Sequence, residues 1–253
     1  MRADRRVRWI SMVLMCAASA VRAQDFRVET DVFAPGAKEP AAEFLTIFYG
    51  NTIYDFRLSE PREITVFDMA RGRFILLDVA RKMKTEITTS EIDAFNQELR
   101  RRAGDRDQAF FQPDLTYSFD EEEGRHDLTS DKLTYRAKGI RPKYAEAVDR
   151  YRVFADAYAQ ISAVRPGNLP PYGRLQLNKV LAEHGEIPED IERTVTVANI
   201  FPPKKITART HHLANWILSE QDQRRIREAG DQIAEFNSVT IDQYLGVPAV
   251  ASK

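Results

Sequence analysis

The sequence predicts an α+β fold in which amphipathic helices cover a curved antiparallel sheet, or half-barrel. Two observations predict it. The first half of the chain consists of short strand-like segments joined by tight turns, and the second half contains long amphipathic helices that end at glycine or proline. The connections between the strands are too short for the crossover that parallel neighbours need, so we expect antiparallel pairs.

The chain begins with the features of a cleavable secretory signal peptide. A run of arginines precedes the apolar stretch Trp9 to Val21, which is shorter than the roughly 20 residues that span a bilayer. Val21 and Ala23 are small residues at the positions that signal peptidase reads, so we expect cleavage after Ala23. The alternatives are an uncleaved anchor or lipid attachment at Cys16. We expect the mature protein to be exported, either periplasmic or extracellular.

Removal of residues 1–23 takes away five arginines and one aspartate, which leaves a net charge of −5 on residues 24–253. A mildly acidic chain does not attract nucleic acid, so we expect no nucleic-acid partner. Cys16 is the single cysteine and leaves with the signal peptide. The mature chain therefore has no disulfide, no thiol nucleophile and no thiolate metal ligand.

Residues 24–253 are expected to form a single α+β domain, because a chain of this length can bury a sufficient apolar core. The segment 167–171, rich in glycine and proline, is the position for a subdivision if there are two units. After the signal peptide no stretch is long and apolar enough to cross a bilayer, so we expect no transmembrane segment in the mature chain.

The strand-like segments of the first half are expected to pair as one meander. They are Phe26–Val32, Phe44–Tyr49, Thr52–Leu58, Glu63–Met69, Arg73–Val79 and Met83–Thr88. Ser90 and Asp93 then resemble a capping box that opens a helix, whose stripe Ile92, Phe95 and Leu99 is expected to pack on the sheet. A further hairpin is expected from Leu115–Asp120 and Leu128–Ala137.

The second half is expected to begin with a helical hairpin. Apolar residues at helical spacing from Tyr144 to Tyr158 predict a long helix that ends near Arg165, and Tyr172–His184 predicts its partner, stopped at Gly185. Two more strands are expected at Arg193–Ile200 and Ile206–Leu213. Ser219 and Asp222 form a second capping box, which opens a helix carrying Ile226, Ala229 and Ile233.

Motifs for common catalytic and cofactor sites are absent. The sequence has no nucleophile elbow, no His-Glu-x-x-His, no phosphate-binding P-loop and no dinucleotide fingerprint, so we expect no cofactor. His211 and His212 are adjacent, and neighbouring side chains on a strand point to opposite faces, so the pair is not expected to chelate a metal. His184 stands beside a helix stop, where an imidazolium interacts favourably with the helix dipole.

Asp55, Asp68 and Asp78 lie in neighbouring strands, where a pair of carboxylates could serve a glycosidase. With turns centred near residues 60 and 71, the expected register puts Asp68 opposite Phe74, Asp78 opposite Ile64 and Asp55 opposite Val66. In that register the three share a face and none has a carboxylate directly across from it. We therefore expect solvated strand ends or arginine partners, with catalytic pairing as the alternative.

The same strands are apolar on both faces. In the expected register one face carries Ile53, Ile64, Val66, Phe74 and Leu76, and the other carries Tyr54, Phe56, Leu58, Phe67, Ile75, Leu77 and Val79. Such a sheet is covered on both sides or curves around something apolar. The second interpretation predicts a concave pocket for a lipid or acyl chain. Its candidate ligand-binding residues are Tyr54, Phe56, Phe67 and Leu77.

Three strand segments carry a family resemblance. Tyr49–Phe56, Ile64–Asp68 and Arg73–Asp78 resemble strands of periplasmic outer-membrane lipoprotein-carrier-like proteins. The resemblance implies an exported half-barrel with covering helices that shelters the acyl chains of a lipidated protein and has no enzymatic activity. The stretch from Pro142 to His184 and the strands and helix after it depart from that pattern.

Three functional hypotheses follow. The first is an exported, non-enzymatic binding protein of the cell envelope whose partner is a lipid or lipidated protein. The second is a secreted hydrolase whose site is assembled from Asp and His residues that are distant in the sequence. The third is a structural or interaction protein without a small ligand.

Overall fold

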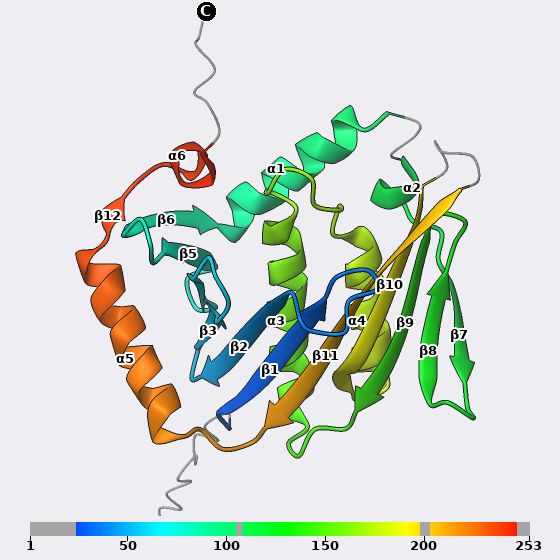
Figure 1. The fold of residues 1–253 in the computed structure, drawn as a ribbon, viewed down its shortest axis with the longest axis horizontal. Coiled ribbons are helices and arrows are strands. Elements are labelled where there is room, and N and C mark those ends of the chain that lie inside the picture. Colours follow the sequence, from blue (N-terminus) through cyan, green and yellow to red (C-terminus); the bar gives the residue numbers. More distant parts are fainter. Residues whose placement is uncertain (1–23, 105–107, 198–202, 247–253) are drawn as a thin grey trace, which may run out of the picture.

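The computed structural model describes residues 24–104, 108–197 and 203–246 (Figure 1). The expected signal peptide and its cleavage site lie outside the described residues. Twelve strands of the described chain form one sheet in the order β12-β6-β5-β4-β3-β2-β1-β11-β10-β9-β8-β7. The sheet is curved, open at β12 and β7, and antiparallel except for the short β12–β6 pair. The predicted α+β fold with a curved antiparallel sheet is confirmed.

The first six strands form the predicted meander. They are β1 (Phe26–Phe33), β2 (Ala42–Tyr49), β3 (Thr52–Arg57), β4 (Glu63–Asp68), β5 (Arg73–Asp78) and β6 (Met83–Thr88). The remaining strands are β7 (Thr116–Asp120), β8 (Arg125–Thr129), β9 (Leu133–Ile140), β10 (Ile187–Val197), β11 (Lys204–Asn215) and β12 (Asn237–Ser238). Strand β1 pairs with β2 on one side and β11 on the other, which joins the two halves of the chain in one continuous sheet.

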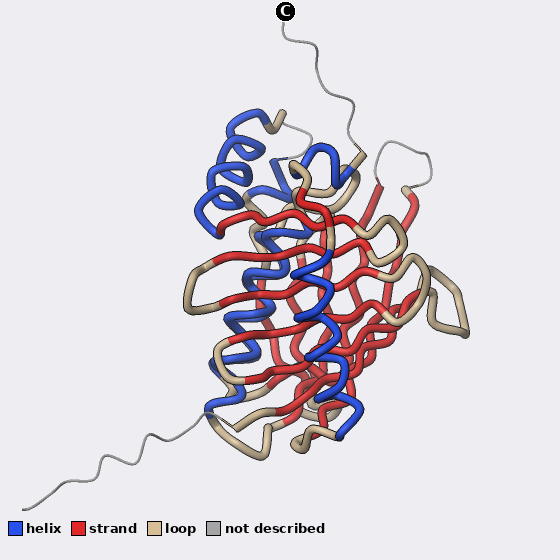
Figure 2. Tube along the Cα trace, turned by 90° about the vertical axis from the view of Figure 1, so that its left-hand side faces the viewer, coloured by secondary structure: helices blue, strands red, loops and turns tan. Residues whose placement is uncertain are grey.

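Helices cover both faces of the sheet. They are α1 (Thr89–Arg102), α2 (Gln108–Phe111), α3 (Glu146–Ser162), α4 (Tyr172–Glu183), α5 (Glu220–Glu235) and α6 (Ile241–Leu245). Helices α3 and α4 pack against each other as the predicted hairpin, and the segment 167–171 lies in their connection. Figure 2 shows the strands between α5 and the helices of the opposite side. Among the described residues, no helix is both long and apolar enough to span a membrane.

Two of these local predictions need correction, and two short helices were not predicted. Helix α1 begins two residues earlier than expected, because its capping box consists of Thr88 and Glu91. The expected hairpin at 115–137 contains three strands, since a tight turn separates β8 from β9. In that turn the Ser130 N–H donates to the Leu133 backbone oxygen, and the Leu133 N–H donates to Ser130 Oγ. Helices α2 and α6 are too short for periodicity to predict. The second predicted capping box, Ser219 with Asp222, does open α5.

The predicted register is wrong by one residue at β4. Ile64 lies opposite Phe56 and Leu77, rather than opposite Asp78. A shift of one residue moves every β4 side chain to the other face of the sheet. Phe67 therefore faces α3, and Ile64 and Val66 face α5.

The two faces of the meander hold two separate cores. On the α3 face, the neighbouring residues of five strands form an apolar row of Phe48, Ile53, Phe67, Phe74 and Ile87. On the opposite face, Ala229 and Phe236 pack on a cluster that includes Leu45, Phe56 and Leu77. The prediction of a sheet covered on both sides is correct for this half, and α5 provides the second cover.

Leu77→Ala is expected to lower the free energy of unfolding by about 2–5 kcal/mol, because the Leu77 side chain is fully buried beneath α5 and its truncation leaves a cavity. Urea denaturation measures the change. The matched control is Leu213→Ala, whose side chain is 60% exposed and whose loss should change stability by less than about 0.5 kcal/mol. Equal stability of the two variants would contradict the packing of α5.

Candidate functional site

The structure brings together three of the four predicted ligand-binding residues. Tyr54, Phe56 and Leu77 lie in the cluster beneath α5, whose side chains fill the space above them. Phe67 is on the opposite face, where its ring stacks on Phe74 with centroids 4.4 Å apart. The four residues therefore do not line one common surface.

A polar row crosses the α3 face of the meander beside the aromatic row. Thr46, Asp55 and Thr65 are direct neighbours on β2, β3 and β4, and all three are buried. The Thr46 hydroxyl donates a hydrogen bond of 2.7 Å to Asp55 Oδ1. A buried carboxylate is costly unless it is hydrogen-bonded, so this row is the most unusual feature of an otherwise apolar face.

Helix α3 places Tyr158 directly against Asp55. The two side chains form a hydrogen bond, and the positive charge of Arg165 acts on Tyr158. Burial raises the pKa of Asp55 to about 6, while the hydroxyls of Thr46 and Tyr158 stabilise the carboxylate and limit the rise. Burial and then the Asp55 charge raise the pKa of Tyr158. Asp55 can therefore exchange a proton near neutral pH, and Tyr158 remains a phenol.

A salt bridge closes the site on its other side. Arg165, just beyond the end of α3, donates to both oxygens of Glu63 at 3.2 and 2.9 Å. Glu63 lies directly opposite Asp78, so the expectation that no carboxylate faces Asp78 is wrong. The resulting cavity, which we call the polar pocket, has a volume of about 180 Å³. Its lining includes Asp55, Arg57, Glu63, Thr65, Tyr158 and Arg165.

An apolar recess adjoins the polar pocket. This second cavity, which we call the aromatic groove, has a volume of about 460 Å³ and includes Phe95, Leu99, Phe110, Phe111, Leu169 and Pro170 in its lining. Val164, Arg165 and Asn168 line both cavities, so the two meet at the turn that follows α3. The sequence does not indicate this groove, because helical spacing places Phe95 in the buried stripe of α1. Ile92 is buried as expected, whereas the Phe95 side chain is 38% exposed.

The other candidate carboxylates are structural. Asp68 and Asp78 each accept a backbone and a side-chain hydrogen bond from an arginine three residues later, Arg71 and Arg81 respectively. The arginines and backbone donors hold the pKa of both carboxyls below the usual range, against the opposing effect of burial. The expected arginine partners at these strand ends are confirmed.

The adjacent histidines point to opposite faces, as expected. His211 is exposed and bonds to Asp190 at 2.9 Å. His212 is buried between the hydroxyls of Thr30 and Thr210, and burial lowers its pKa to about 3. His184 caps the C-terminal end of α4.

Comparisons with known proteins identify no family. No protein-family model matches the chain, and no curated protein matches it. One solved structure, described as PNGF-II in a P21 crystal form, is similar with a TM-score of 0.38 and 9% sequence identity. The match covers 88% of this chain and about a third (32%) of that one. A likeness this distant supports no statement about function.

The difference in free energy of unfolding between Asp55→Asn and the wild type is expected to shift in favour of the variant as the pH rises. The raised pKa means that the folded state binds the Asp55 proton more tightly than the unfolded state. Wild-type stability therefore falls between about pH 4 and pH 6, by about 3 kcal/mol for a shift of about two pKa units, and the variant lacks this loss.

Urea denaturation at about pH 4 and pH 7 measures the effect of Asp55→Asn. Asp93→Asn, a change at an exposed position of α1, is the control and should keep the wild-type pH dependence. If Asp55→Asn also keeps the wild-type slope, Asp55 is not the titrating group.

Proposed function

We propose that this protein is an exported, non-enzymatic binding protein whose ligand has a polar head and an apolar tail. The observation that carries the proposal is that the polar pocket and the aromatic groove are neighbours, because Val164, Arg165 and Asn168 line both. Ligand sites are typically concave and mostly apolar, with a few polar groups that fix orientation. The two cavities together have that character.

The polar pocket defines the chemistry of the head group. Within the part of the chain that the structure describes, Asp55 is paired with hydroxyls and not with a cation, so it favours a ligand group that donates hydrogen bonds or carries positive charge. Arg165 and Arg57 line the same cavity and offer donors to an acceptor such as a phosphate. A zwitterionic lipid head group supplies both kinds of atoms. The proposed ligand is therefore still a lipid, as the sequence predicts. Its proposed site lies at the end of α3 rather than beneath α5, where Tyr54, Phe56 and Leu77 lie.

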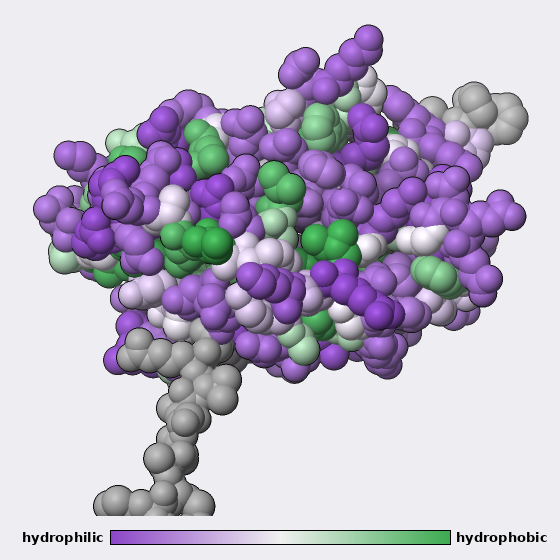
Figure 3. All heavy atoms as spheres, turned by 90° about the horizontal axis from the view of Figure 1, so that it is seen from below, coloured by the Kyte–Doolittle hydropathy of each residue, from purple (hydrophilic) through white to green (hydrophobic). Residues whose placement is uncertain are grey.

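The aromatic groove offers a recessed place for an apolar tail. Figure 3 shows the side of the molecule away from α1, where hydrophilic residues predominate and apolar residues form small, separate patches. An acyl or alkyl chain is more stable in a groove lined by aromatic side chains, at about 25 cal/mol for each Å² of apolar surface removed from water. Phe95, Phe110 and Phe111 provide that lining.

Phe95→Glu is expected to weaken binding of a medium-chain lysophosphatidylethanolamine at least about tenfold, because it places a charge in the aromatic groove. Native mass spectrometry of the purified protein detects any ligand that co-purifies, and calorimetric titration with the lipid measures affinity. Val153→Glu is the matched control, because Val153 is a similarly exposed apolar residue of α3 that lines neither cavity. Binding that is absent, or unaffected by Phe95→Glu, argues against the proposal.

A second candidate function is glycoside hydrolysis in the polar pocket. Glu63 lies two residues from Thr65, the direct partner of Asp55, so the two carboxylates are diagonal neighbours on adjacent strands. Backbones at such positions are about 7–8 Å apart. Two carboxylates in one cavity, one of them with a pKa near 6, resemble a general acid and its charged partner.

If the pocket is hydrolytic, Asp55→Asn and Glu63→Gln should each lower the turnover of a nitrophenyl glycoside by at least about 100-fold. Wild-type turnover should decline above about pH 6 as the Asp55 acid loses its proton. Asp68→Asn, a change at a strand end outside the pocket, is the control. If both pocket variants keep the wild-type turnover, or if the wild type turns over no nitrophenyl glycoside, the hydrolase function is rejected and only the binding function remains.

A further inference from the structure

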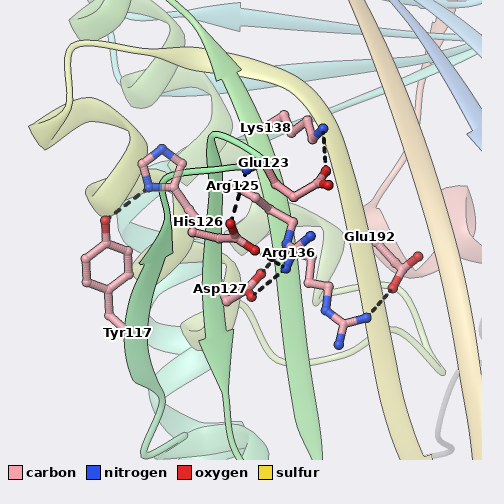
Figure 4. Close-up of polar contacts among 9 residues, drawn as sticks. Tyr117, Glu123, Arg125, His126, Asp127, Arg136, Lys138 and Glu192 are labelled. Carbon is pink, nitrogen blue, oxygen red and sulfur yellow. Dashed lines mark hydrogen bonds and ion pairs between the residues drawn. The ribbon is translucent and has the colours of Figure 1, made fainter.

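A second cluster of reactive side chains lies near the opposite edge of the sheet, away from the polar pocket. It consists of Tyr117 on β7, His126 on β8, His184 at the end of α4 and Glu186 just before β10. Figure 4 shows Tyr117 and His126 joined by a hydrogen bond. The charged residues of the same strands, such as Arg125 and Asp127, form ion pairs on the other face. The cluster is therefore separated from them by the sheet.

One ring nitrogen of each histidine lies within hydrogen-bond distance of an acceptor outside the His–Tyr group. His126 Nε2 lies 3.0 Å from Glu186 Oε2, and His184 Nδ1 lies 2.8 Å from the backbone oxygen of Val180. Both acceptors lack a proton in their usual state, so each nitrogen must be the one that carries hydrogen. The remaining nitrogens, His126 Nδ1 and His184 Nε2, are left with lone pairs in the neutral rings. This is the arrangement found around metal-binding histidines, whose second nitrogen donates to a carboxylate or a backbone carbonyl.

Both free nitrogens point at a single oxygen. The Tyr117 hydroxyl oxygen is 3.2 Å from His126 Nδ1 and 3.1 Å from His184 Nε2. Ligands that bind a tetrahedral ion at about 2.0–2.1 Å are separated from one another by about 3.3 Å. The observed nitrogen-to-oxygen distances are therefore close to those between ligands of one ion.

The hydrogen bonds of the cluster cannot all be satisfied by neutral groups. Four contacts connect Glu186, His126, Tyr117, His184 and the Val180 oxygen. Neutral Tyr117, His126 and His184 supply one proton each, which leaves one of the four contacts without a proton. The ring nitrogen at that contact has a lone pair that can bind a metal cation.

The Glu186 side chain has room beside the sheet only because residue 139 is a glycine. Gly139 on β9 lies beneath it, and a Cβ at this position would come within 2.2 Å of Glu186 Oε2 and 2.8 Å of its Cβ. His126 itself is fully buried, while the Tyr117 side chain is 40% exposed and His184 is exposed. The cluster thus has a buried, oriented side and a side open to solvent.

We propose that His126 Nδ1, His184 Nε2 and the Tyr117 oxygen bind one divalent transition-metal ion of the Zn²⁺ type. Imidazole nitrogens suit Zn²⁺ and Cu²⁺, and three protein ligands leave a fourth position for water on the exposed side. The phenolic proton of Tyr117 passes to solvent when its oxygen binds the ion. Among the described residues, no group of three or more His, Cys, Asp or Glu side chains is placed to hold a metal. This site reaches three ligands only because a tyrosine is one of them.

Calorimetric titration of the purified full chain with Zn²⁺ tests the site. We expect one ion per chain, and binding at least about tenfold weaker in His184→Gln and in Tyr117→Phe, each of which removes one ligand. Glu186→Gln should weaken binding by about 10–100-fold, since Glu186 orients His126 without touching the ion. His211→Gln is the matched control, because His211 is exposed on the other face, and it should bind as the wild type does.

Circular dichroism establishes that each variant is folded. Histidine-ring NMR of the wild type provides a second measurement that needs no variant, since Zn²⁺ should shift the signals of His126 and His184 and leave that of His212 unchanged. The proposal is wrong if no Zn²⁺ binds, or if His184→Gln and Tyr117→Phe bind it as tightly as the wild type. It is also wrong if Zn²⁺ leaves the ring signals of both His126 and His184 unchanged.

Discussion

The packing of α3 on the aromatic side chains of β1 and β2 is the interaction on which the rest of the architecture depends. Phe48 stacks on Phe26 at 4.1 Å and meets Phe154 edge-on at 5.8 Å. Arg150 donates to the backbone oxygens of Gln24 and Gly50 beside this cluster. Together these contacts fix the position of α3 along the sheet. Because helix residues four positions apart share a face, Tyr158 follows Phe154 and reaches Asp55.

The two halves of the sheet differ in how many of their faces are buried. The meander is buried on both faces, so its few polar side chains, Asp55 above all, must find partners inside the protein. Beyond β1, the face of the sheet opposite α3 and α4 carries ion pairs such as Arg136–Glu192 and Lys138–Glu123, which are exposed to water (Figure 4). The two candidate sites lie on the face covered by α3 and α4, where a buried carboxylate or imidazole must be hydrogen-bonded.

Much of the fold was predictable because it is local. The strands of the meander follow from alternation and short turns, and the Ser219–Asp222 box correctly opens α5. The register of β4 was not predictable. Because β4 is apolar on both faces, its sequence looks the same to either face, and nothing in it indicates the one-residue shift in its pairing with β3. The same error grouped Phe67 with Tyr54, Phe56 and Leu77. The sequence indicates Asp55 as a candidate, but not its partner Tyr158 or the Glu63–Arg165 pair that lines the same pocket.

The sequence by itself determined the fold class, the meander, the helical hairpin and the arginine partners of Asp68 and Asp78, since each depends on residues close together in the chain. Only the tertiary structure decided which side chains meet across long separations. Tyr158 reaches Asp55 through the docking of α3, and His184 reaches Tyr117 through the placement of α4 beside the β7–β8 hairpin. These contacts depend on how helices pack on a twisted sheet, and no periodicity within one segment carries that information.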